Sequence, residues 1–124
     1  PNIHILADER MLRQALLNLF RNAAEAIPSD KQKRLVDIRV EVDDAGRNQW
    51  ATVEVKDTGD GIPAADLHRI FIPFFTTKPS GHGVGLALAH RVVTQHNGTL
   101  SAANHNGGGA VFTMRLPVAN EALS

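Results

Sequence analysis

Asp57-Thr58-Gly59-Asp60-Gly61-Ile62-Pro63 is the stretch that decides the fold, and it directly follows the alternating apolar and polar run Ala51–Lys56. The alternation predicts a β-strand over 51–56, which delivers the carboxylate of Asp57 to a pair of closely spaced glycines. Because glycine has no Cβ, its backbone lets a flat ligand come close. The stretch therefore predicts the floor of a ligand pocket, although Asp-Gly pairs also form ordinary surface turns.

A second glycine-rich stretch, Gly81-His82-Gly83-Val84-Gly85, leads into a pattern typical of a helix. A glycine loop that enters a helix N-terminus presents free backbone N–H groups and the positive end of the helix dipole, which favour phosphate. The dinucleotide fingerprint does not fit, because Leu86 stands where that motif needs glycine, and the sequence has no Gly-Lys-Ser/Thr of a P-loop. The stretch is compatible with a phosphate-binding loop and with a plain helix entry.

Asn18 and Asn22 lie one helical turn apart on one face of the helix expected over residues 9–27. Amide groups that share a helix face must find hydrogen-bond partners. An amide oxygen is also a suitable Mg²⁺ ligand when water and phosphates complete the octahedron, as they do beside a nucleotide. The pair therefore indicates either a magnesium site or two asparagines that solvent satisfies.

The composition is that of an ordinary soluble domain, with 43% hydrophobic and 21% charged residues among 124. Thirteen basic residues balance thirteen acidic ones, so the chain lacks the positive field that nucleic-acid-binding and membrane-surface proteins need. Cysteine is absent, which excludes disulfides and thiolate metal sites and fits a reducing compartment such as the cytoplasm. The chain begins Pro1-Asn2 without an initiator Met or signal peptide, so we expect it to be part of a longer protein.

Hydrophobic periodicity predicts one domain over residues 1–117 and a disordered tail over 118–124. We expect strands at 2–5, 36–43, 51–56, 99–103 and 110–116, and helices at 9–27, 63–71 and 84–97, the last with Gly98 as its left-handed cap. About five strands and about three helices without a repeat indicate a two-layer α/β sandwich. The sheet is expected to be mixed and covered by helices on one face.

Four segments resemble, in order, the boxes of a known catalytic domain. Asn18-Leu19-Phe20-Arg21-Asn22-Ala23, Asp57–Pro63, Phe71-Ile72-Pro73-Phe74-Phe75-Thr76-Thr77-Lys78 and Gly81–Leu86 are similar to the asparagine, first glycine, phenylalanine and second glycine boxes of bacterial sensor histidine kinases. The short lid most resembles the nitrogen-regulation, pilus-regulation and oxygen-sensing kinases. The resemblance covers nearly the whole chain and implies the ATP-binding fold of that superfamily, the Bergerat fold, with ATP and Mg²⁺ as cofactors.

The resemblance also implies roles for individual residues. Asp57 would accept a hydrogen bond from the adenine amino group, Gly59 and Gly61 would admit the base, and Asn22 would ligate Mg²⁺. Asn18 would help to position the reacting phosphate; related gyrase and chaperone ATPases carry a glutamate there, so asparagine suits phosphoryl transfer better than hydrolysis. The remaining nucleotide contacts would be Ile62, Phe71, Thr77, Lys78, Gly81, His82, Gly83, Val84, Gly85 and Leu86.

The family's phosphoacceptor histidine lies in a separate dimerising helical hairpin, and none of the six histidines here has that sequence context. The resemblance therefore implies part of an enzyme, which would act with the dimerisation and histidine phosphotransfer domain of the same kinase and with a downstream response regulator. We expect a cytoplasmic domain without nucleic-acid or direct membrane contacts, whether or not the parent protein is membrane-anchored. An anti-sigma-factor serine kinase of the same fold and a non-catalytic nucleotide-binding module are the alternatives.

Overall fold

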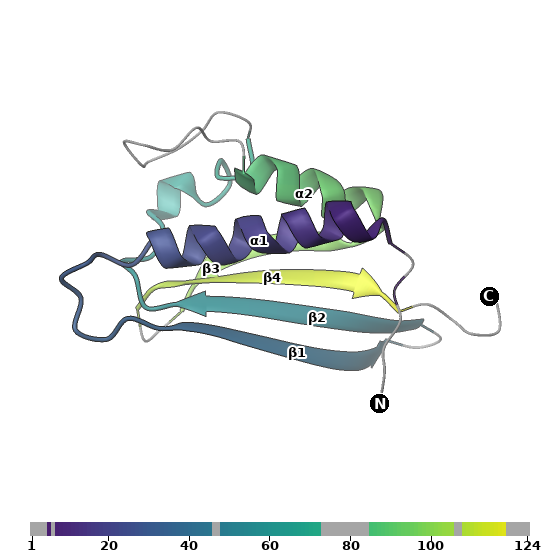
Figure 1. Cartoon of the computed structure of the whole chain (residues 1–124), viewed down its shortest axis with the longest axis horizontal. Helices are drawn as coiled ribbons and strands as arrows, with labels where there is room; N and C mark the ends of the chain where they lie inside the picture. The colour runs from purple at the N-terminus through teal and green to yellow at the C-terminus, as the bar shows by residue number, and fades with distance from the viewer. Residues whose placement is uncertain (1–4, 6, 46–47, 73–84, 106–107, 119–124) are drawn as a thin grey trace.

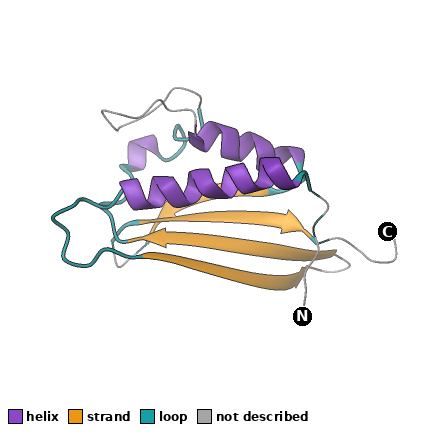
Figure 2. Ribbon diagram, viewed as in Figure 1, coloured by secondary structure: helices purple, strands orange, loops and turns teal. Residues whose placement is uncertain are grey.

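The computed structural model describes residues 5, 7–45, 48–72, 85–105 and 108–118, which form a helical layer on one face of a sheet (Figures 1 and 2). The elements in chain order are α1 (Glu9–Glu25), β1 (Val36–Ala45), β2 (Asn48–Asp57), a short 3₁₀ helix η1 (Ala64–Asp66), α2 (Gly85–Gln95), β3 (Thr99–Asn104) and β4 (Ala110–Pro117). This arrangement confirms the predicted two-layer α/β sandwich.

The described sheet has four strands in the order β1-β2-β4-β3, and all three pairings are antiparallel. The prediction of a mixed sheet is therefore wrong for the described strands. The connection through α2 returns β3 parallel to β2, but β4 pairs between these two strands and makes both contacts antiparallel. The opening strand expected at 2–5 lies almost wholly outside the described residues, and Ile5 has no regular secondary structure.

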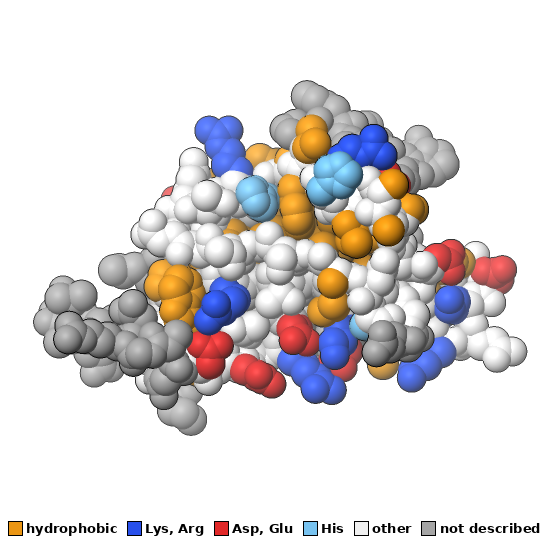
Figure 3. Space-filling view, turned by 180° about the vertical axis from the view of Figure 1, so that it is seen from behind, with side chains coloured by type: hydrophobic (Ala, Val, Ile, Leu, Met, Phe, Trp, Pro, Cys, Tyr) orange, Lys and Arg blue, Asp and Glu red, His pale blue; other side chains and the backbone are white. Residues whose placement is uncertain are grey.

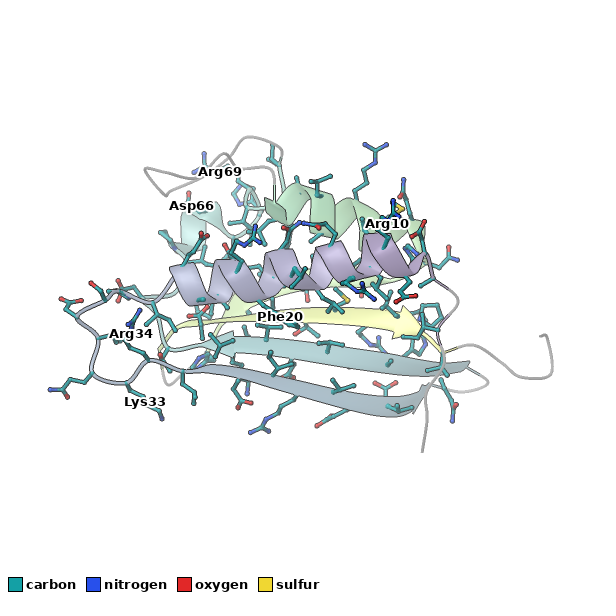
Figure 4. All side chains as sticks on the ribbon, viewed as in Figure 1. Arg10, Phe20, Lys33, Arg34, Asp66 and Arg69 are labelled. Atoms are coloured by element: carbon teal, nitrogen blue, oxygen red, sulfur yellow. The ribbon has the colours of Figure 1, made fainter. Side chains whose placement is uncertain are left out.

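The core lies between the two layers. Side chains alternate along β4 between buried and partly exposed, as period-two geometry requires, and β4 contacts α2, while α1 contacts β2 and β1. Phe20 of α1 is partly buried against this core and lies between the helix and the sheet (Figure 4). The most deeply buried residues of α1, α2 and β4 are Ala15, Leu19, Ala23, Ala89, Val93, Phe112, Met114 and Leu116.

The ends of three predicted elements differ from the structure. α1 ends at Glu25, before the expected Ile27, and the segment expected as a helix over 63–71 contains only the short η1 followed by turns. At the end of α2 the left-handed residue is Asn97, with φ of 64°, and not Gly98. Asparagine tolerates that conformation, and the N–H of Gly98 donates to Val93 O at 2.9 Å in the Schellman pattern.

The polar surface is mixed in sign. On the face shown in Figure 3, Lys and Arg side chains are interspersed with Asp and Glu side chains over the sheet layer, while hydrophobic side chains gather over the helical layer. Among the described helices, none has the length and apolar character needed to span a membrane. Val118 still donates its N–H to Gln49 O at 3.0 Å, and the rest of the expected tail, 119–124, lies outside the described residues.

His96 joins the C-terminal end of α2 to the N-terminal end of α1. Its Nε2 accepts from the N–H of Asp8 at 2.9 Å, and its Nδ1 lies 2.7 Å from Val92 O, to which it must donate because a carbonyl only accepts. Asp8 in turn caps α1 by accepting from Met11 N at 3.2 Å. The neutral imidazole with its proton on Nδ1 therefore holds the two antiparallel helices in register.

We expect His96→Ala to lower the free energy of unfolding by about 1–2 kcal/mol, because both hydrogen bonds are lost. Denaturant unfolding measures the change. The matched control is His68→Ala, which removes a histidine whose side chain is exposed. Equal losses in the two variants would contradict the bridging role of His96.

Candidate functional site

The site is built around Asp57, which lies at the C-terminal end of β2 and is only 2% exposed. Its Oδ1 accepts from the N–H of Gly59 at 2.8 Å and from the N–H of Ala110 at 3.3 Å. Its Oδ2 is buried and has no hydrogen-bond partner among the described residues. A buried oxygen without a donor is costly, so this acceptor is a candidate for a contact with a donor group of a ligand.

The two glycines of the Asp57 stretch are required by contacts within the protein. A Cβ at Gly59 would lie 2.4 Å from the carbonyl oxygen of Ala26, just after α1. Gly61 has φ of 81°, and a Cβ there would lie 2.7 Å from Asn104 Oδ1. The glycines therefore let the loop pack against α1 and β3, and their predicted contact with a base stays a prediction.

The loop between α1 and β1 is tied to the same stretch through Thr58. The Thr58 hydroxyl donates to Lys33 O at 2.7 Å and accepts from Leu35 N at 3.0 Å. Lys31 Nζ lies 3.4 Å from Asp60 Oδ1, in an ion pair that is largely solvent-exposed. These contacts hold the basic loop that carries Lys33 and Arg34 beside the Asp57 stretch (Figure 4).

The turn between β3 and β4 supplies residues that the sequence analysis missed. Asn104 donates from Nδ2 to Ile62 O and accepts at Oδ1 from Ile62 N, both at 2.7 Å. His105 Nε2 donates to the backbone oxygen of Asp57 at 3.1 Å. The available signal was the run Gly107-Gly108-Gly109 directly before a buried strand, which is more glycine than a plain hairpin needs.

The predicted asparagines lie on the half-buried face of α1 that meets α2. A Cβ at Gly85, the first residue of α2, would lie 3.7 Å from Asn18 Oδ1, so the structure brings Asn18 and the end of the second glycine stretch together. Asn18, Asn22 and Ala26 follow one another at one-turn spacing, which extends over about 12 Å of helix axis. One extended ligand can therefore reach from the Asp57 end to the start of α2.

Phe71 and Leu86 both pack against the core. The Phe71 ring stacks on His90 with centroids 5.0 Å apart, and its edge contacts Phe112 at 6.2 Å. The described ring contacts of Phe71 are thus with α2 and β4, and its predicted contact with the nucleotide stays a prediction. Beside it, Asp66 and Arg69 form an ion pair at 2.6 Å (Figure 4).

Several predicted contacts lie outside the described residues: Thr77, Lys78, Gly81, His82, Gly83 and Val84, with the loop expected over 76–83. A hollow of about 590 Å³ is described elsewhere, on the N-terminal half of α1. None of the predicted site residues lines it, so we do not assign the ligand site there. Its lining residues are Asp8, Glu9, Arg10, Arg13, Gln14 and Leu17.

Residues 7–120 match the family model described as histidine kinase-, DNA gyrase B-, and HSP90-like ATPase. The sensor histidine kinase ZraS of Escherichia coli (strain K12) is 43% identical over 114 residues, which are 92% of this chain and 23% of that protein. The sensor protein FixL of Bradyrhizobium diazoefficiens is 38% identical over 117 residues, or 94% of this chain and 22% of that protein. The chain thus spans under a quarter of these curated relatives.

The solved structures agree with the sequence relatives. A mycobacterial sensor histidine kinase, MprB, superposes with a TM-score of 0.79 at 31% identity, over 92% of this chain and 74% of that chain. Full-length ShkA in complex with AMPPNP gives a TM-score of 0.79 at 33% identity, over 97% of this chain and 24% of that one. Together with the fold and the geometry around Asp57, these matches confirm the resemblance, and the chain belongs to the family of histidine kinase-, DNA gyrase B- and HSP90-like ATPases.

Proposed function

We propose that this chain is the catalytic ATP-binding domain of a sensor histidine kinase. It would bind Mg·ATP and, with a dimerisation and histidine phosphotransfer domain of the same parent protein, transfer the γ-phosphate to a histidine, from which a response regulator receives it. The single observation that carries the proposal is the buried, unpartnered Oδ2 of Asp57. We also propose that the domain lies in the cytoplasm, which the lack of cysteine supports.

The base end of the site fits adenine. A carboxylate oxygen only accepts hydrogen bonds, and the adenine amino group is a donor, whereas guanine has a carbonyl oxygen at the same ring position. The N–H groups of Gly59 and Ala110 occupy Oδ1 and so leave Oδ2 for the ligand. Asp57 would therefore both hold adenine and reject guanine, because an unpaired acceptor facing another acceptor costs binding energy.

The phosphate end fits a triphosphate. The N-terminal end of α2 lies beside Asn18, and a helix N-terminus offers N–H groups and a positive dipole to phosphate oxygens. An amide oxygen is a suitable Mg²⁺ ligand when phosphates and water complete the coordination, so the amide oxygen of Asn22 and the phosphates would hold Mg²⁺. Bound Mg²⁺ would neutralise charge on the phosphates.

Asn18 separates the proposed activity from simple hydrolysis. Its amide cannot take a proton from water, so it would orient the terminal phosphate without acting as a general base. Phosphoryl transfer then depends on a nucleophile that another domain holds in line with the phosphate. We propose that the chain binds ATP alone but needs its phosphoacceptor domain for turnover.

Incubation with γ-labelled ATP tests this function. The isolated chain should bind ATP and remain unlabelled, and adding the dimeric helical domain of its parent should place acid-labile, base-stable phosphate on that domain. A variant of the helical domain without the acceptor histidine is the control. Label on this chain alone, acid-stable label on a serine of a partner, or rapid phosphate release without a partner would contradict the proposal.

Asn22→Ala should weaken Mg·ATP binding by about tenfold and leave adenosine binding unchanged, because the proposed contact is to the metal and not to the base. Calorimetric titrations with the two ligands measure both affinities. Gln14→Ala removes an exposed amide elsewhere on α1 and serves as the matched control. Equal losses for adenosine and Mg·ATP would be inconsistent with a magnesium ligand.

A further inference from the structure

The connection between β3 and β4, with Asn104 and His105 on one side and Ala110 on the other, holds both ends of the loop from Asp57 to Ile62. At the first end, His105 Nε2 donates to Asp57 O at 3.1 Å, and the Ala110 N–H donates to Asp57 Oδ1 at 3.3 Å. At the second end, the side-chain amide of Asn104 makes two hydrogen bonds of 2.7 Å with the backbone of Ile62. A single turn therefore fixes where the acceptor carboxylate lies relative to the loop beneath it.

Gly61 and Gly109 lie between Asn104 and the carboxylate of Asp57. A Cβ at Gly61 would lie 2.7 Å from Asn104 Oδ1 and 3.6 Å from Gly109 O, and a Cβ at Gly109 would lie 3.1 Å from Asp57 Oδ1. The side chain of Asn104 thus lies close to the backbone of Gly61, and Gly109 lies between Gly61 and Asp57. Because the Asn104 side chain pairs with a backbone N–H and C=O together, it fixes the orientation of the Ile62 main chain as a strand partner would.

We propose that Asn104 is a positioning residue for the nucleotide base. It would touch no ligand itself, and it would act by holding the Gly61–Ile62 backbone in the shape that the base meets, next to Asp57. Without it, the loop would have to be ordered at the moment of binding, and that ordering reduces affinity. This inference rests on the proposed function, because it assumes that the base binds at Asp57.

The location of Asn104 makes the role separable from folding. Its residue is exposed, so a substitution leaves no buried polar group unpaired, and β3 keeps its backbone pairing of Asn104 with Ala110. Ser101, an exposed residue of the same strand, is a matched control. Asn104→Ala removes both hydrogen bonds, while Asn104→Asp keeps the size and one acceptor but places a second carboxylate oxygen against Ile62 O.

The experiment compares these variants by calorimetric titration with Mg·ATP and with adenosine, at a temperature where each variant is folded. Asn104→Ala and Asn104→Asp should each lower the affinity about tenfold, and by the same factor for Mg·ATP as for adenosine, because both ligands contain the base. Amide hydrogen exchange at Ile62 should become faster in Asn104→Ala, which removes the acceptor of that N–H. Ser101→Ala should bind as the unmodified chain does.

Other outcomes overturn the inference. If Asn104→Asp binds normally while Asn104→Ala is weak, the donated bond to Ile62 O is not needed, and the two-bond positioning proposed here is wrong. If both variants melt earlier but keep their affinities, the role is structural. Failure of the unmodified chain to bind ATP, or equal binding by Asp57→Ala, would instead contradict the proposed function, so the two failures can be told apart.

Discussion

Asp57→Ala should weaken Mg·ATP binding by about 1.5–3 kcal/mol, roughly 10- to 150-fold, because it removes a charge-assisted hydrogen bond to the adenine amino group. The variant also leaves the N–H groups of Gly59 and Ala110 without the acceptor Oδ1 to which they donate in the unmodified protein. Calorimetric titration with a non-hydrolysable ATP analogue measures the loss. An unchanged dissociation constant would remove Asp57 from the ligand site.

The control for this variant lies in the same stretch. Asp60 is exposed, and its carboxylate pairs only loosely with Lys31 at 3.4 Å. Asp60→Ala removes the same group from a neighbouring position and should leave ATP affinity unchanged, because exposed ion pairs contribute little. A similar loss in both variants would mean that the effect comes from local charge and not from a contact with the base.

Asp57→Asn separates hydrogen-bond direction from shape. The amide can keep an acceptor toward Gly59 N, and its NH₂ group then takes the place of the buried Oδ2. It would donate where adenine also donates, so ATP should bind more weakly while inosine triphosphate, which has a carbonyl oxygen there, should lose less. A fall in the ratio of ATP affinity to inosine triphosphate affinity supports the direct contact, and equal losses for the two nucleotides oppose it.

Residues close together in the sequence were predicted well. The alternation over 51–56 predicted the strand that ends at Asp57, and the structure extends it to β2, Asn48–Asp57. The helical spacing of Asn18 and Asn22 placed both on one face of α1, and in the structure Asn18 lies beside Gly85 at the start of α2. Local periodicity fixes which side chains share a face, so such features are available without tertiary information.

Features set by distant partners were missed or wrong. Asn104 bonds to Ile62 across 42 residues of chain, and no periodicity reports such a pair. The predicted mixed sheet is wrong for the described strands, because β4 lies between β2 and β3 and pairs antiparallel with both. Strand order and the contact between Asn104 and Ile62 both depend on long-range pairing, which local periodicity does not report.

The wall formed by the β3–β4 turn leads to the prediction with the largest expected effect on the fold. Gly109 has φ of 87°, and a Cβ there would lie 2.1 Å from the backbone oxygen of Asp57. Neighbouring Gly108 has φ of 90°, but a Cβ there would meet nothing within 4 Å among the described residues. The two positions therefore share a positive φ, but Gly108 is exposed while Gly109 is buried against Asp57.

Gly108→Ala should cost about 1–2 kcal/mol of unfolding free energy, the ordinary penalty of a left-handed alanine, and should keep ATP affinity. Gly109→Ala carries the same penalty and in addition drives Asp57 and β4 apart, so we expect a loss of about 4 kcal/mol or more together with loss of ATP binding. Denaturant unfolding and calorimetric titration measure the two effects. Equal destabilisation by the two substitutions would show that Asp57 can move without cost, and the buried acceptor would then not be held in place by the turn behind it.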